Sequence, residues 1–206
     1  MTLAAFLAVA FLHLMAAISP GPAVLMAART GVTEGLRTGF FLACGIGAGG
    51  VVWALAALFG LNLVFEAAPR LLWSLKIAGG LYLIWMAVRM WREARTPLDL
   101  SAGAAARPPR SRLSAFRLGL TTQLANPKPA VLFSAIFVGT VPQGTPIWVY
   151  GALLAVVFLN ETVWNTLVAR VFSFEPTRTG YIGLKTLVDR AFGGMLALLG
   201  LKIAAT

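Results

Sequence analysis

The sequence predicts an all-α integral membrane protein with six transmembrane helices in two inverted three-helix repeats. Three observations predict this fold: an apolar composition, six well-spaced apolar stretches, and a proline motif that occurs twice. Of the 206 residues, 59% are hydrophobic and 12% are charged, whereas a soluble domain is about 45–50% apolar and about 25% charged. A soluble globule cannot bury this much apolar surface, which argues against soluble enzymes, nucleic-acid-binding proteins and disordered chains.

Six stretches are apolar enough to cross a bilayer, which takes about 20 residues. They are the segments 3–26, 38–60, 71–90, 115–139, 147–169 and 185–205. The first stretch contains no Lys or Arg before Arg29. It therefore lacks the positive region of a cleaved signal peptide, and we expect it to be a retained span.

The basic residues indicate how the chain is oriented in the membrane. Of the 17 Lys and Arg residues, 13 lie in or beside the segments 27–38, 89–117 and 170–190, which share one side of the predicted membrane. The positive-inside rule places that side in the cytoplasm, so both termini are expected on the periplasmic side of a bacterial inner membrane. The net charge of +10 is then explained by orientation and contact with membrane lipid, with no nucleic-acid partner.

A segment rich in Pro, Ala and Gly divides the chain into two halves. We expect a first three-helix repeat over 1–92, a cytoplasmic linker over 93–113 and a second three-helix repeat over 114–206. Residues 19–26 and 126–133 match at five of eight positions, at an offset of 107. Three spans per half make the second half enter the membrane from the opposite side, the inverted topology used by secondary transporters.

Each copy of the Pro-x-Pro motif is expected to break its helix near the middle of the membrane. Ser19 and Asn126 are good N-cap residues, and Pro20 and Pro127 then take the first helical position. The two helix starts would present free N–H groups to one central anionic group; simple helix kinks are the alternative. The predicted site comprises Ser19, Pro20, Gly21, Pro22, Asn126, Pro127 and Lys128.

Ionisable residues inside a span are costly and mark a transport pathway by default. Lys128 and Glu161 each lie near the middle of a span and are candidates to pair, in transport or as a structural ion pair. Glu161 is also a candidate proton carrier, because desolvation favours the neutral carboxyl group. Trp164 and Asn165 lie within about one turn of Glu161 and complete the predicted substrate site. His13, the only histidine, is either a second proton-coupling residue or a helix-packing residue.

The remaining unusual residues predict packing rather than chemistry. Gly39, Gly45, Gly47, Gly49 and Gly50 in the second span are expected to allow close helix contacts, and such faces are compatible with a homodimer. The single cysteine cannot form a disulfide within the chain. We expect neither a metal nor a cofactor.

Together these motifs resemble the lysine exporter (LysE/RhtB-type) family of translocators. The similar segments are S-P-G-P at 19–22, K-I-A-G-G-L-Y-L at 76–83, and N-P-K at 126–128 with Leu132-Phe133 after it. Trp164 and the closing segment 189–201 also fit the pattern. The resemblance implies a six-span bacterial inner-membrane exporter of amino acids and their derivatives, driven by the proton gradient. Ala23, Pro129 and the residues 141–143 depart from the family pattern, which leaves the substrate open.

We therefore predict a secondary active, proton-coupled exporter of a small zwitterionic amino acid or derivative. The helix starts would bind the substrate carboxylate, Glu161 would face its ammonium group or carry the proton, and Lys128 would supply a counter-charge. The alternatives are export of a metal cation or another toxic metabolite, a membrane-embedded enzyme, and a non-transporting scaffold. The chain contains no H-E-x-x-H or G-x-S-x-G motif, which disfavours an enzyme. A scaffold would gain nothing from two opened helices.

Overall fold

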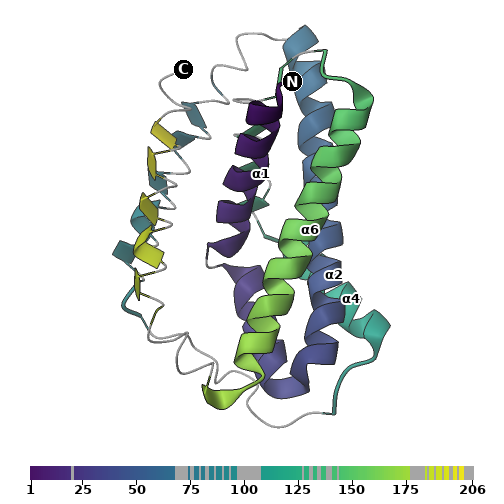
Figure 1. Ribbon diagram of the computed structural model, residues 1–206, viewed down its shortest axis with the longest axis vertical. Coiled ribbons are helices and arrows are strands. Elements are labelled where there is room, and N and C mark those ends of the chain that lie inside the picture. Colours follow the sequence, from purple (N-terminus) through teal and green to yellow (C-terminus); the bar gives the residue numbers. More distant parts are fainter. Residues whose placement is uncertain are drawn as a thin grey trace.

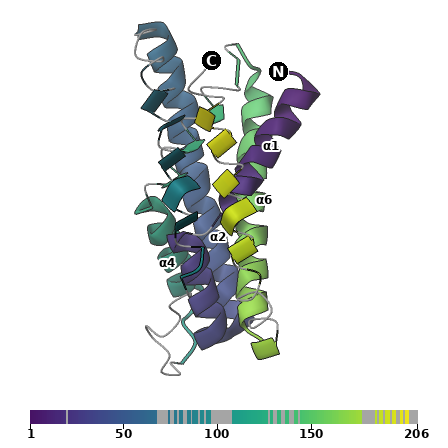
Figure 2. The ribbon, with the colours of Figure 1, turned by 90° about the vertical axis from the view of Figure 1, so that its left-hand side faces the viewer.

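The computed structural model describes residues 1–19, 21–67, 108–126 and 144–176, and part of the residues within 74–96, 128–142 and 184–201. Four helices are described: α1 (Leu3–Ile18), α2 (Pro22–Ala67), α4 (Arg112–Leu124) and α6 (Ile147–Phe172). They run roughly along one long axis and form an elongated bundle (Figures 1 and 2). No strand occurs in the described part of the chain.

The first predicted span, 3–26, is broken as expected, but the second half starts two residues later than predicted. α1 ends at Ile18, and the Ser19 N–H donates to the Met15 carbonyl at 3.2 Å. α2 begins at Pro22, and the Leu25 N–H donates to the Gly21 carbonyl at 2.9 Å. Ser19 therefore caps the end of α1 instead of the start of the next helix. A proline disfavours the α conformation of the residue before it, so Gly21 stays outside the helix that begins at Pro22.

α2 reverses direction at Gly35, which has φ 81° and ψ 177°. Glycine adopts such a positive φ without the strain that a Cβ atom would cause. The residues before and after the turn face the same part of α6, because Gly31 and Gly39 both lie against Ala169. α2 thus consists of two helical parts: residues 22–34, which continue from the first predicted span, and residues 36–67, which contain the second predicted span, 38–60 (Figure 1).

Glycines bring α4 and α6 into backbone contact with α2, as the sequence predicted for the second span. A Cβ atom on Gly45 would collide with the Phe116 carbonyl, and one on Gly119 would collide with the Leu42 carbonyl. Gly47 in the same way faces Thr162 on α6. Small residues of this kind let helix backbones approach closely, so these contacts fix the positions of α4 and α6 on α2.

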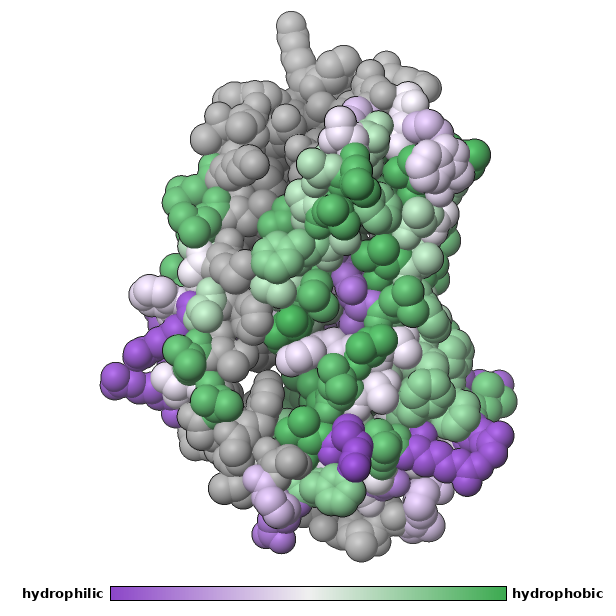
Figure 3. All heavy atoms as spheres, in the orientation of Figure 1, coloured by the Kyte–Doolittle hydropathy of each residue, from purple (hydrophilic) through white to green (hydrophobic). Residues whose placement is uncertain are grey.

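Basic side chains gather at the end of the bundle that holds the Gly35 turn. The Arg110 N–H donates to Glu34 Oε2 at 2.8 Å, and Arg110 Nε lies 3.5 Å from Glu34 Oε1. Arg170 lies in the last turn of α6, and α1 starts at the opposite end (Figure 1). Hydrophilic side chains lie mainly toward the lower end of the surface in Figure 3, below a mostly apolar middle.

Two described helical stretches are long and apolar enough to cross a membrane, Pro22–Gly60 and Ile147–Phe172, while Leu3–Ile18 is a shorter apolar helix. The predicted spans 71–90 and 185–205 are described only in part. The residues that follow 71–90 contact the start of 185–205, since Trp91 Nε1 donates to the Arg190 carbonyl at 2.8 Å and Thr186 Oγ1 donates to the Ala94 carbonyl at 3.0 Å. Much of the predicted linker, 93–113, lies outside the described residues.

Candidate functional site

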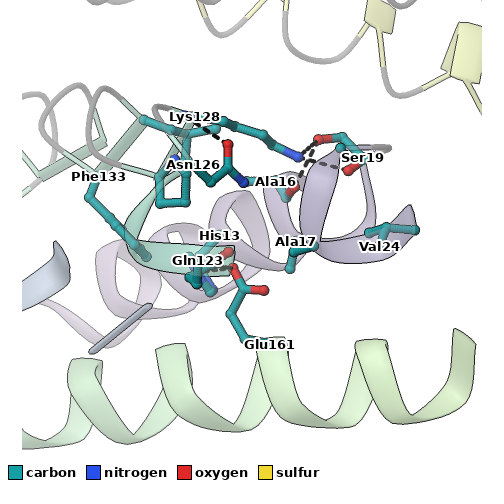
Figure 4. Close-up of a pocket in the computed structure, with 14 residues that line it drawn as sticks. His13, Ala16, Ala17, Ser19, Val24, Gln123, Asn126, Lys128, Phe133 and Glu161 are labelled. Atoms are coloured by element: carbon teal, nitrogen blue, oxygen red, sulfur yellow. Dashed lines mark hydrogen bonds and ion pairs between the residues drawn. The ribbon is translucent and has the colours of Figure 1, made fainter. Parts of the chain in front are cut away.

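A pocket of about 360 Å³, counting the space at its open mouth, lies where the two helix breaks meet α6 (Figure 4). Its walls come from the end of α1, the start of α2, the end of α4 with the helical residues that follow it, and the middle of α6. Apolar side chains such as Val24, Leu132 and Phe133 line part of it. The polar lining residues are His13, Ser19, Gln123, Asn126, Lys128 and Glu161.

Lys128 connects the two breaks. Its Nζ donates to the Ser19 carbonyl at 2.7 Å and also contacts Ser19 Oγ (Figure 4). The end of a helix carries carbonyls without intrahelical partners and a partial negative charge, so the end of α1 stabilises the ammonium group. Gly21 lies directly beside it, because a Cβ atom there would make ordinary van der Waals contact with Lys128 Nζ at 3.7 Å.

Asn126 begins the helical segment that carries Lys128. α4 ends at Leu124, and Lys128 is helical again. Asn126 Oδ1 accepts a hydrogen bond from the Lys128 N–H at 3.1 Å, which is the capping contact predicted from the sequence. The fourth predicted span, 115–139, is therefore broken at its motif, although Pro127 itself lies outside the described residues, as does Pro20.

Glu161 faces the breaks from α6 and is 6% exposed. Its Oε1 accepts a hydrogen bond from Gln123 Nε2 at 3.1 Å, and its Oε2 accepts one from Asn165 Nδ2 at 3.3 Å. His13 Nε2 lies 3.8 Å from Oε1. A carboxylate in an apolar interior is costly unless it is hydrogen-bonded, and these partners reduce that cost.

His13 is oriented by contacts on both sides of its ring. Asn160 Nδ2 lies 3.1 Å from His13 Nδ1 and also donates to the Ala10 carbonyl at 3.2 Å. An amide nitrogen only donates, so Nδ1 is the acceptor, and in the neutral ring the N–H is then on Nε2, toward Glu161. The ring stacks on Phe133, with centroids 5.0 Å apart. His13 thus lies between Asn160 and the Glu161 carboxylate.

The structure gathers most, but not all, of the predicted site residues at the pocket. Pro22 begins α2 and is exposed, without lining the pocket. Trp164 packs against the apolar cluster at the start of α2, which includes Ala23 and Val24. Asn165 holds Glu161 from behind the pocket and also donates to the Glu161 carbonyl at 2.8 Å.

The expected direct pairing of Lys128 with Glu161 is not among the contacts of the described residues. Lys128 bonds to Ser19, and Glu161 is held by two amides. The free carbonyl at the end of α1 is the acceptor that Lys128 reaches, and spacing along the sequence does not reveal this contact.

Gln123, which the sequence marks only as a candidate for hydrogen bonds beside Glu161, lines the pocket, and so does Phe133, which was not predicted. A signal for Gln123 exists, because a buried amide in an apolar span is itself an intramembrane polar group. Phe133 has no such signal, since aromatic residues are common in spans. Among the described residues, no group of three or more His, Cys, Asp and Glu side chains is placed to hold a metal ion.

Known proteins resemble this chain along nearly its whole length. The sequence model of the LysE type translocator family matches residues 14–206. The threonine efflux protein of Escherichia coli (strain K12) is 34% identical over 205 residues, which cover 96% of each chain. The homoserine/homoserine lactone efflux protein of Salmonella typhimurium is 28% identical over 91% of this chain and 90% of its own. The leucine efflux protein of Klebsiella pneumoniae is 29% identical over 58% of this chain and 55% of its own. No solved structure is significantly similar.

Proposed function

The chain belongs to the LysE type translocator family, and from this premise we propose that it exports a small amino acid or amino-acid derivative across the bacterial inner membrane. Three of its relatives are named for the efflux of threonine, homoserine or its lactone, and leucine. These compounds share a primary ammonium group and a small body. The pocket between the helix breaks is the proposed substrate site.

The observation that carries this proposal is the meeting of the two breaks at one half-buried lysine, Lys128. The substrate carboxylate would bind the ammonium group of Lys128 and draw it from Ser19. It would also lie near the first turn of α2, where helical geometry leaves the N–H groups of Ala23 and Val24 without intrahelical partners. Both residues line the pocket. A helix start and a cation together favour a carboxylate.

The opposite wall would bind the substrate ammonium group and couple its movement to protons. Glu161 is the acidic residue that faces the pocket among the described residues. A carboxylate that holds either an ammonium group or a proton, but not both, links the export of one to the entry of the other. His13, with its Nε2 3.8 Å from the carboxylate, is the proposed partner in proton transfer.

The proposed topology has six spans in two inverted repeats, with both termini in the periplasm. The gathering of Arg110 and Arg170 with the Gly35 turn at one end supports this orientation, because basic residues are retained on the cytoplasmic side. Two glycines with positive φ, Gly35 and Gly144, precede the helical stretches 36–67 and 147–172. These equivalent turns support the repeat.

Whole cells loaded with dipeptides would test the proposed function. Cells that make the protein should release threonine, homoserine or leucine faster than cells that lack it, as measured by the amino acid that accumulates in the medium. The matched control is Lys128→Met, which keeps the length of the side chain and removes its charge. This variant should reach the membrane and release no more than cells without the protein. If none of the three amino acids leaves faster with the wild-type protein, the proposed function is wrong.

A further inference from the structure

Gln123 is a polar residue of the pocket that the proposed function leaves without a role. It lies in the last turn of α4, directly before the second break, and is 1% exposed. Because the helix is broken after this turn, the turn faces the pocket, and Gln123 lines the pocket together with Glu161. A buried amide within a membrane needs partners for its oxygen as well as its nitrogen.

Contacts with α2 hold Gln123 in one position. Its main-chain carbonyl accepts a hydrogen bond from Trp53 Nε1 at 3.1 Å. Gly49 and Gly50 leave room for its side chain, because a Cβ atom on Gly49 would lie 2.7 Å from Gln123 Cβ. A Cβ atom on Gly50 would lie 3.3 Å from Glu161 Cγ and 3.7 Å from Gln123 Nε2. The two glycines therefore accommodate the Gln123–Glu161 pair.

The carboxylate of Glu161 decides which way the amide faces. An ionised carboxylate only accepts hydrogen bonds, so Gln123 must turn its Nε2 toward Glu161, as the distance of 3.1 Å shows. Its Oε1 then faces away and is buried without a hydrogen-bond partner among the described residues. Such an unpartnered acceptor is unfavourable. Because Gln123 lines the pocket, a donor bound there can satisfy it.

The pocket wall thus offers two kinds of acceptor close together, a carboxylate and an amide oxygen. A group that serves both must carry several N–H donors and a positive charge, which describes a primary ammonium group. A hydroxyl group in its place supplies one donor and no charge. It would leave either the carboxylate without a charged donor or the amide oxygen unpaired, and buried polar groups that lose their partner discriminate strongly between substrates.

We propose that Gln123 determines the specificity of the exporter for substrates with a free primary ammonium group. Its Nε2 holds the Glu161 carboxylate, and its Oε1 accepts one N–H of the substrate while Glu161 accepts another. This inference rests on the proposed function, because it assigns the ammonium end of the same pocket. It adds the requirement that the substrate amine is neither replaced nor fully substituted.

The decisive experiment compares threonine with 2,3-dihydroxybutanoate, in which a hydroxyl group replaces the ammonium group. Both are loaded into liposomes that contain the purified protein, and the ratio of their transport efficiencies is measured. Gln123→Leu keeps the approximate shape of the side chain and removes both polar atoms. We expect this variant to reduce the preference for threonine at least about tenfold, because a charged hydrogen bond is lost.

Asn165→Leu is the matched control. Asn165 is equally buried and donates to the same carboxylate at 3.3 Å, but it does not line the pocket. Its loss should lower the transport of both compounds and leave their ratio within about threefold of the wild-type ratio. A ratio that Gln123→Leu leaves unchanged would overturn the inference, since Gln123 would then act only through Glu161. Wild-type protein that moves no threonine would instead contradict the proposed function.

A second measurement uses only the wild-type protein and so does not depend on the folding of a variant. The rate of threonine export is measured in the presence of competing N-methylated threonines, which keep the positive charge and lose one N–H with each methyl group. Competition should weaken with each methyl group. Equal competition by the trimethylated compound, which has no N–H, would contradict a role for Oε1 as an acceptor.

Discussion

The two helix breaks share a backbone plan but contribute different chemistry to the pocket. The first break ends α1 and offers the carbonyl and hydroxyl oxygens of Ser19 as acceptors. The second break ends α4 and supplies Lys128, a donor and a charge. Position 128 corresponds to Gly21 in the other motif, and the ammonium group of Lys128 lies next to that glycine. The comparison teaches that the shared motif provides the geometry, whereas the difference between its copies provides the polarity.

Exchanging the residues at these two positions would test the comparison most strongly. Lys128→Gly makes the two motifs alike at this position and removes the ammonium group that binds the carboxylate. Threonine export should fall at least about 100-fold, because the substrate carboxylate would enter the pocket without its positively charged partner. The double variant Gly21→Lys/Lys128→Gly should recover export at least about tenfold over the single variant, because the two positions face each other.

Gly21 is suited to this exchange. Among the described residues only Gly35 and Gly144 have a positive φ, so a lysine at position 21 meets no backbone strain. Export is measured in dipeptide-loaded cells, and the amount of each variant in the membrane is measured alongside. If both variants are present in the membrane and the double variant exports no better than Lys128→Gly, the breaks do not share one anion site.

Glu161→Gln addresses whether the wall opposite the breaks only binds substrate or also couples transport to protons. The substitution keeps an acceptor oxygen but removes the group that exchanges a proton. In liposomes, a pH gradient should no longer accelerate export, and the KM for threonine should rise about tenfold because the ammonium group loses its counter-charge. A variant that the gradient still drives would show that the coupling proton is carried elsewhere.

The smallest effects should come from the two residues that begin the motifs. Asn126→Ala removes the cap of the helical segment that positions Lys128, which costs about 1 kcal/mol or about a fivefold loss of export. Ser19→Ala removes the hydroxyl oxygen near Lys128 but leaves in place the hydrogen bond of 2.7 Å from Lys128 Nζ to the main-chain carbonyl of residue 19. Export should therefore fall only about twofold to threefold. A larger effect of Ser19→Ala in parallel export assays would reverse this order and make the hydroxyl the main ligand of Lys128.

The sequence predicted the helix breaks because proline and its neighbours act locally. Pro22 and Asn126 each mark the start of a helical segment through backbone geometry alone. The error of two residues at the first break arose because Pro20 and Pro22 both suit a first helical position, and only Gly21 between them decides the choice. The close packing of glycines in the second span was also predictable, since small residues in a span have few other uses.

The contacts inside the pocket were harder to predict because they depend on how helices rotate about their axes. The partner of Lys128 is a main-chain carbonyl of Ser19, and carbonyls carry no signal in the sequence. Trp164 lies only three residues from Glu161 yet packs outside the pocket. Gln123 reaches Glu161 because α4 and α6 both pack on α2, a long-range arrangement that no local pattern encodes.

Two close contacts fix α4 along α2: Gly45 on α2 lies against the Phe116 carbonyl, and Gly119 on α4 lies against the Leu42 carbonyl. α4 carries Gln123 four residues beyond Gly119, about 6 Å farther along the helix. A slip of one residue would move α4 by about 1.5 Å, and the bond of 3.1 Å between Gln123 and Glu161 would be lost. A residue larger than glycine at either position would therefore misalign the pocket without touching it. The relative positions of the pocket residues therefore depend on two glycines outside the pocket, Gly45 and Gly119, where any side chain would push α2 and α4 apart.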